Sequence, residues 1–158
     1  MAGFLFIKRN SKTFSNKNDG DDFSASLSVF SKKKLELNIC FNKDEFTLYV
    51  FKKRFSNKKN YYEFDNGDFI VALGTFIYGY KTGVEGLKGL YVDFRSGVDF
   101  MNNICGNYCI LIYYGGKLYI FRDYFGYYPV YTTNDFSTIS TSYLALCFAI
   151  KKLSVSKH

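Results

Sequence analysis

The sequence predicts one strand-rich globular domain of the α+β class, with an all-β architecture as the alternative. Its 158 residues suffice for one domain with a full-sized core, and a content of 47% hydrophobic and 21% aromatic residues disfavours disorder. Short apolar runs that end at glycine, asparagine or aspartate turns recur along the chain and indicate strands. Segments with apolar residues at helical spacing add helices to this pattern.

The amino-terminal part is expected to form a strand and a helix. Gly3–Lys8 is apolar and predicts the first strand, whereas Asn10–Asp21 is polar, has no periodicity and predicts a loop. Asp21-Asp22 can cap a helix over Phe23–Ser31, because a carboxylate there accepts free backbone N–H groups. Three apolar side chains share one face of that helix: Phe23, Leu27 and Phe30.

The middle of the chain is expected to contain a hairpin, a turn and a buried strand. Leu35–Phe41 and Phe46–Phe51 alternate as two paired strands about Asn42-Lys43-Asp44. Asp65–Asp68 is a turn before the strand Phe69–Leu73. The residues that follow leave two possibilities open, because Gly83–Phe94 fits either a poor helix or an irregular crossing.

The segment from 97 to 121 is expected to form a short helix followed by a tight hairpin. Gly97–Cys105 places Val98, Met101 and Ile104 on one helical side. Tyr108–Tyr114 and Lys117–Phe121 are apolar strands on either side of Gly115-Gly116, where both glycines tolerate the positive φ of a two-residue turn.

The carboxyl-terminal part is expected to turn a corner and close with a helix. Arg122-Asp123 and Pro129 bracket a corner at Gly126, and Val130-Tyr131 is a short strand. Ser140-Thr141 predicts the N-cap of the closing helix.

This order of elements resembles the amino-terminal domain of glutamine-dependent asparagine synthetases and the wider class II glutamine amidotransferases. The family pattern is Gly-x-Phe, a strand, a tight turn, a strand ending Arg-Asp-x-x-Gly-x-x-Pro-Leu-Tyr-Tyr, then Ser-Glu-x-Lys-Ala-Leu. The matching residues here are Gly106, Arg122, Asp123, Gly126, Pro129, Tyr131, Ala145 and Leu146. The resemblance implies that residues 1–158 form one Ntn-hydrolase-like αββα sandwich, with two antiparallel sheets between helical layers.

The resemblance also implies a catalytic residue at position 2. In the family a cysteine there becomes amino-terminal once the initiator methionine is removed, and its thiolate attacks the glutamine side-chain amide. Its own α-amine, with a pKa of about 8, serves as the base. This chain has Ala2, followed by the matching Gly3 and Phe4, so it has no nucleophile for that route.

The other glutamine-pocket positions implied by the family are mostly altered. They fall on Leu73, Gly74, Thr75, Cys105 and Gly106. Leu73 replaces the asparagine of the oxyanion hole, although Gly74 keeps its backbone N–H. Cys105 replaces the aspartate that holds the glutamine α-amine, and Lys32–Lys34 follows the first helix where the family has a carboxylate-binding arginine.

Three hypotheses follow for function. The favoured one is a glutaminase-like domain without glutaminase activity that serves as a structural or binding partner of an ATP-dependent synthetase domain or subunit. The first alternative is an active glutaminase that supplies ammonia, with its cysteine replaced by Ala2, and it binds glutamine if the pocket is intact. The second alternative is a basic nucleic-acid-binding module.

The net charge of +7 bears on the last hypothesis. Lysines and aromatic residues interleave over residues 49–64, as they do on surfaces that bind single-stranded nucleic acid. A hairpin with a solvated lysine-rich tip is the favoured interpretation, so nucleic acid is not an expected partner.

The remaining features predict a cytoplasmic protein without a cofactor. No apolar run reaches the roughly 18 residues that span a bilayer, and the start lacks the features of a signal peptide. The four cysteines lie in apolar runs and are expected to be buried rather than to bind zinc: Cys40, Cys105, Cys109 and Cys147. No phosphate-binding loop of the family's ATP-using domain is present, so a partner would have to supply that activity.

Overall fold

The computed structural model describes residues 2–9, 19–56 and 59–150, without the side chains of 19–23. Contacts between residues divide the chain into two compact units. Unit 1 consists of residues 1–56 and 129–158, and unit 2 consists of residues 57–128. Each unit has its own antiparallel sheet.

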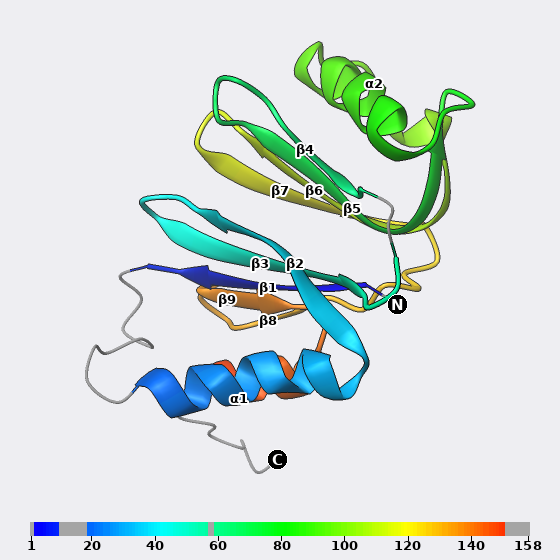
Figure 1. Cartoon of the computed structure of the whole chain (residues 1–158). Coiled ribbons are helices and arrows are strands. Elements are labelled where there is room, and N and C mark those ends of the chain that lie inside the picture. The colour runs from blue at the N-terminus through cyan, green and yellow to red at the C-terminus, as the bar shows by residue number, and fades with distance from the viewer. Residues whose placement is uncertain (1, 10–18, 57–58, 151–158) are drawn as a thin grey trace, which may run out of the picture. The chain divides into compact units, whose positions relative to one another are not determined.

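The sheet of unit 1 has five strands in the order β2-β3-β1-β9-β8 (Figure 1). Their bounds are Gly3–Lys8 (β1), Leu35–Asn42 (β2), Phe46–Lys53 (β3), Tyr131–Thr132 (β8) and Thr138–Ser140 (β9). The amino-terminal strand is central, because Leu5 is opposite Tyr49 of β3 on one side and Ser140 of β9 on the other. Strand β1 is therefore held by one partner from each of the two sequence segments that make up unit 1.

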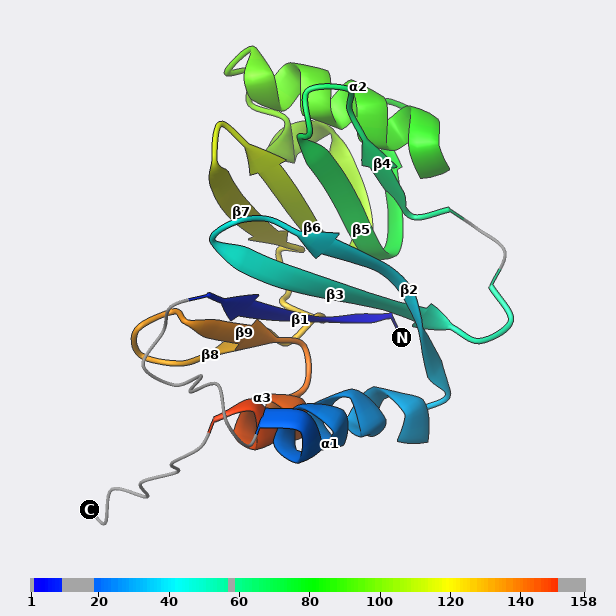
Figure 2. The same ribbon diagram turned by 60° about the vertical axis from the view of Figure 1, so that its left-hand side comes forward.

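Two helices cover one face of this sheet, α1 (Asp19–Lys32) and α3 (Tyr143–Ala149) (Figure 2). The core between the helices and the sheet includes Leu5, Ile7 and Ala145, together with Phe30, whose ring stacks on Phe51 at 4.0 Å between centroids. Rings buried in this way contribute large apolar areas, so the helices are fixed mainly by packing.

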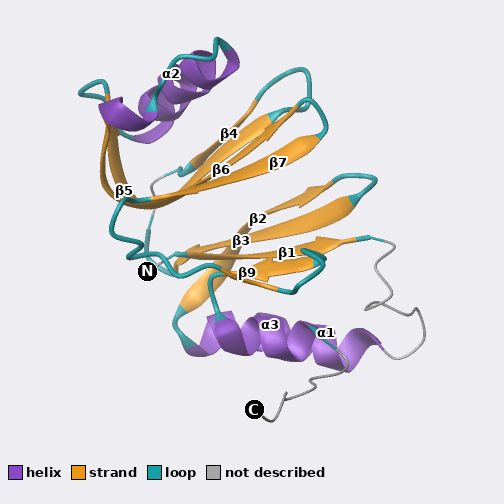
Figure 3. Cartoon of the chain, turned by 180° about the vertical axis from the view of Figure 1, so that it is seen from behind, coloured by secondary structure: helices purple, strands orange, loops and turns teal. Residues whose placement is uncertain are grey.

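Unit 2 contains a four-stranded sheet in the order β4-β5-β6-β7, with one helix across a face (Figure 3). The strands are Tyr61–Glu63 (β4), Phe69–Tyr78 (β5), Ile104–Tyr114 (β6) and Lys117–Arg122 (β7), and the helix is Gly83–Arg95 (α2). Leu87, Leu90 and Tyr91 of α2 are buried against alternate residues of β5 and β6, such as Ile70 and Ile110. The period of two along each strand gives the sheet this apolar face.

The predicted mixed α+β class is confirmed, since the described ranges contain two antiparallel sheets and three α-helices. The first strand was predicted with its observed bounds. The hairpins about Asn42–Asp44 and Gly115-Gly116 are also confirmed. Both Gly115 (φ 58°) and Gly116 (φ 78°) have the positive φ that a two-residue turn of this kind requires.

Several predicted boundaries are wrong. Helix α1 begins at Asp19, so Asp21-Asp22 lies inside the helix rather than at its cap; residues 10–18 of the expected loop lie outside the described ranges. Gly97–Cys105 is not a helix, because Gly97 (φ 71°) ends α2 and Ile104 already belongs to β6. Only a 3₁₀ turn over Met101–Asn103 remains, where the Asp99 side chain accepts the Met101 N–H at 3.2 Å.

Two further corrections concern strand pairing. Ser140 is in β9 and pairs with Leu5, so the closing helix has its N-cap at Ser142 instead of Ser140-Thr141. The expected lysine-rich hairpin over residues 49–64 does not form, because β3 and β4 belong to different sheets and β4 pairs with β5. No helix in the described part of the chain has the length and apolar character needed to cross a membrane.

Candidate functional site

The β5–β6 ladder places the pocket positions implied by the family on adjacent strands. Thr75 is opposite Asn107, and the next pairs along are Phe76 with Gly106 and Ile77 with Cys105. Leu73 and Gly74 precede Thr75 on β5, so all five positions lie on two paired strands. Leu73 is fully buried and aliphatic, so its side chain donates no hydrogen bond to an oxyanion.

Two glycines in this ladder occupy backbone conformations that other residues rarely adopt. The φ of Gly74 is 93° and that of Gly106 is 122°. A Cβ on Gly74 would lie 2.2 Å from the Asn107 carbonyl oxygen and 2.6 Å from Cε2 of Tyr128. A Cβ on Gly106 would lie 2.2 Å from the Thr75 carbonyl oxygen. Both positions therefore require glycine for close approach of the backbones.

Ala2 stands directly before β1, in unit 1, whereas the five pocket positions belong to unit 2. The beginning of β1 is tightly held, because the Phe4 N–H donates to Oγ1 of Thr141 at 3.0 Å. A Cβ on Gly3 would lie 2.7 Å from Cε1 of Phe30. These contacts hold Gly3 and Phe4, directly after residue 2, and residue 2 itself has a methyl side chain, which cannot form a thioester.

The cysteines near these strands differ in exposure. Cys105 is exposed, so the prediction that it is buried is wrong, whereas Cys109 is fully buried. Burial raises the pKa of the Cys109 thiol to about 12, with Arg122 opposing the shift and Asp123 adding to it. Such a thiol stays protonated at neutral pH and is a poor nucleophile. Within the described residues, no three His, Cys, Asp or Glu side chains group as a metal site would require.

Asp123 organises the corner that follows β7. Its N–H donates to the Tyr108 carbonyl at 3.0 Å, its carbonyl accepts the Gly126 N–H at 3.0 Å, and its Oδ1 accepts the Tyr127 N–H at 3.1 Å. Oδ2 is buried and has no hydrogen-bond partner among the described residues. Arg122 is exposed, and Pro129 is half-buried at the start of the second segment of unit 1.

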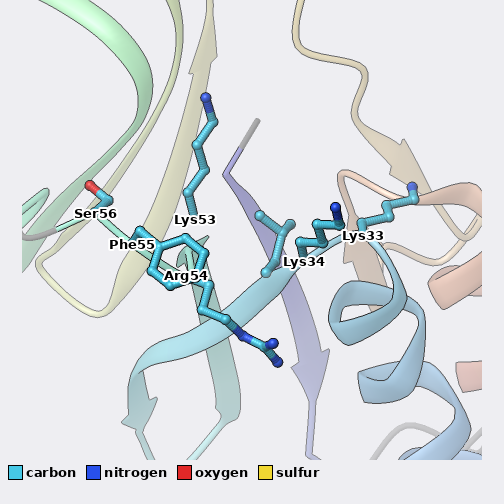
Figure 4. Close-up of a pocket in the computed structure, with 7 residues that line it drawn as sticks. Lys33, Lys34, Lys53, Arg54, Phe55 and Ser56 are labelled. Atoms are coloured by element: carbon cyan, nitrogen blue, oxygen red, sulfur yellow. The ribbon is translucent and has the colours of Figure 1, made fainter.

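A second candidate site lies in unit 1, at the open end of the β2–β3 hairpin, where β2 begins and β3 ends (Figure 4). It is a hollow of about 370 Å³, lined by Lys33, Lys34, Leu35, Lys53, Arg54, Phe55 and Ser56. These residues come from two basic runs that the sequence separates by almost 20 positions. Antiparallel pairing joins them, because Leu35 is opposite Lys53 and the Arg54 N–H donates to the Lys34 carbonyl at 3.3 Å. The register of the predicted hairpin was the signal that could have revealed this site.

Comparison of the chain with protein-family models, curated proteins and solved structures found no match.

Proposed function

We propose that this chain is a glutaminase-like domain of the class II amidotransferase type that does not hydrolyse glutamine and serves as a structural or binding partner of an ATP-dependent synthetase. One observation carries the proposal: the central strand β1 begins directly after residue 2, and that residue is alanine. A central strand that begins directly after residue 2 suits a nucleophile at that position, and an alanine side chain has no nucleophilic atom.

The arrangement of unit 2 supports the loss of glutamine binding as a whole. In the family, a charged aspartate holds the α-ammonium group of glutamine. This chain has Cys105 at that position, and its neutral thiol cannot replace the charge. At the oxyanion position the buried Leu73 side chain offers only apolar surface. Each of these changes would weaken substrate binding or transition-state stabilisation, and a single deliberate replacement of the cysteine accounts for none of them.

The fold that we propose for the whole chain is the αββα sandwich of the Ntn hydrolases. Two antiparallel sheets, one covered by two helices and the other by one, are components of such a sandwich. The ATP-using activity would come from a separate subunit or from a longer protein of which this chain is part.

Restoring the cysteine tests this proposal. Ala2→Cys is assayed for glutamate and ammonia release from glutamine, after mass spectrometry has verified that Met1 is removed. We expect activity at the background of the parent chain, because Leu73 and Cys105 remain. Glutamine should also give no heat of binding in calorimetry with either protein. Turnover of glutamine by Ala2→Cys well above background would establish the active-glutaminase alternative instead.

A further inference from the structure

The hollow at the open end of the β2–β3 hairpin, opposite its turn, has an unusual combination of side chains. Four of its seven lining residues are cationic and none is acidic: Lys33, Lys34, Lys53 and Arg54 carry the charge. Figure 4 shows Lys33 and Lys34 on one side, and Lys53, Arg54 and Phe55 on the other. The cations therefore come from both of the chain segments that line the hollow, residues 33–35 and 53–56.

The backbone around the hollow is fixed by hydrogen bonds. Helix α1 ends in a turn in which Lys33 and Lys34 donate their N–H groups to Phe30 and Ser31 at 3.0 and 2.9 Å. Lys34 then takes a left-handed conformation, with φ 59°, and its carbonyl accepts the Arg54 N–H. Two like-charged runs are thus held together by the fold, although their mutual repulsion opposes this arrangement.

No acid is among the seven residues that line the hollow. The nearest one along β2 is Glu36, and its carboxylate already lies 3.5 Å from the Nζ of Lys52. Lys33 donates to Oγ of Ser142 at 3.3 Å, which satisfies a donor without compensating the charge. The whole net charge resides in this unit: by sequence, unit 1 has 14 Lys and Arg against seven Asp and Glu, and unit 2 has seven against seven.

An aromatic ring stands beside these cations. The side chain of Phe55 is 92% exposed, and Leu35 contributes a buried apolar contact to the lining. A ring exposed to this degree gains almost nothing from the protein's own core, yet it offers a flat surface for stacking. Stacking on such a ring is a common way of holding a nucleobase, while Arg and Lys side chains bind phosphate oxygens.

We propose that this hollow binds a nucleotide, with its phosphates among Lys34, Lys53 and Arg54 and its base against Phe55. The volume of about 370 Å³ falls in the range of small-ligand sites. The shared chemistry is a phosphate group next to a base, supplied either by a free nucleotide or by single-stranded nucleic acid. This inference does not depend on the glutaminase-like proposal, because Lys53, Arg54 and Phe55 occupy none of the glutamine-pocket positions implied by the family.

Calorimetric titration of the full chain with ATP, tripolyphosphate and adenosine at about 0.15 M salt tests the inference. ATP should bind one site per chain, and adenosine more weakly. The double variant Lys53→Gln/Arg54→Gln should lower the affinity for ATP and for tripolyphosphate at least about tenfold. The control Lys81→Gln/Lys117→Gln removes the same charge from exposed positions of unit 2 and should change affinity less than about twofold. Circular dichroism verifies that each variant is folded.

Phe55→Ala separates the two parts of the proposed ligand. It should lower the affinity for ATP several-fold and leave the affinity for tripolyphosphate unchanged, because only ATP has a base that can stack on the ring. The inference is overturned if ATP does not bind, if the two double variants behave alike, or if Phe55→Ala affects neither ligand. A 12-nucleotide oligo(dT) identifies the source: binding more than about tenfold tighter than ATP indicates single-stranded nucleic acid, and equal or weaker binding indicates a free nucleotide.

Discussion

The hydroxyl of Tyr91 donates a hydrogen bond to Oδ2 of Asp68 at 2.5 Å, joining helix α2 to the turn that precedes β5. Both residues are buried, and the same carboxylate oxygen accepts a second bond from Nδ2 of Asn66 at 2.7 Å. The ring of Phe64 stacks on Tyr91 at 3.9 Å between centroids. A buried carboxylate with two donors is stable inside the protein, so these contacts anchor the helix to its sheet.

Replacing Tyr91 with phenylalanine should destabilise the protein. The variant keeps the ring and its packing but removes one donor from the buried carboxylate of Asp68. We expect the free energy of unfolding to fall by about 1–3 kcal/mol and the Tm by several degrees. The control Tyr80→Phe changes a fully exposed side chain and should leave Tm unchanged. Equal Tm values for the two variants would show that the bond adds nothing to stability.

Substitution of Gly74 should be more damaging than substitution of a turn glycine. Gly74→Ala combines a positive φ with a Cβ only 2.2 Å from a backbone oxygen, so the strands must separate. We expect a loss of more than about 2 kcal/mol in urea unfolding. Gly116→Ala also has a positive φ but meets open space, and should cost about 1 kcal/mol. A loss for Gly74→Ala no larger than that of Gly116→Ala would refute the steric argument.

Asp123 should contribute more to stability than its neighbour Arg122. Asp123→Ala removes the acceptor of the Tyr127 N–H and is expected to cost about 1–3 kcal/mol, measured by thermal unfolding. Asp123→Asn keeps an acceptor for the Tyr127 N–H, so it should be milder than Asp123→Ala. Arg122→Ala affects an exposed side chain and should stay within about 0.5 kcal/mol of the parent. The order would be contradicted if Arg122→Ala were the most destabilising of the three.

The stability of the protein should decline in alkaline solution. Burial raises the pKa of Cys109 from 9.0 to about 12, so above pH 9 the unfolded chain loses the thiol proton while the native chain keeps it. The unfolding free energy then falls as pH rises, by at most about 1.4 kcal/mol per pH unit for one group. Tyr91 adds to this decline above pH 10, because burial and Asp68 raise its pKa to about 12.

Urea unfolding at several pH values between 8 and 10.5 measures this decline, and Cys109→Ala provides the comparison. The level of stability differs between the two proteins because the side chains differ in packing, so the slopes with pH are compared. The slope above pH 9 should be shallower in Cys109→Ala. Parallel slopes would mean that this thiol titrates in the native state as it does when unfolded.

Local patterns were sufficient to predict the elements whose neighbours are close in sequence. The hairpins about Gly115-Gly116 and Asn42–Asp44 were predicted because, in each, turn residues stand directly between two apolar segments of the sequence. Strand β9 was missed, because Thr138–Ser140 is short and polar and becomes a strand only by pairing with β1. Helix α2 was left open because of its glycines, yet at Gly86 a Cβ would lie 2.9 Å from the Lys81 carbonyl. The helix needs glycine there to pack closely.

The two candidate sites also differ in whether local sequence or the pairing of distant segments reveals them. The positions around Gly74 and Gly106 could be named from a resemblance, since they are carried by short motifs. The basic hollow depends on the strand register that places Leu35 opposite Lys53 and on the turn at Lys34, so spacing alone did not reveal it. Exposure was equally hard to predict: Cys105 and Cys109 lie in one apolar run, but only Cys109 is buried.

The central position of β1 has a consequence for the order in which the chain can fold during synthesis. All strands of unit 2 come from residues 57–128, so they are synthesised before the second segment of unit 1, which begins at Pro129. Strand β1 precedes all of them, but its partner β9 comes from residues 138–140, so Leu5 must wait for Ser140. One edge of β1 therefore stays unpaired while the whole of unit 2 is synthesised, and an unpaired edge can associate with other nascent chains.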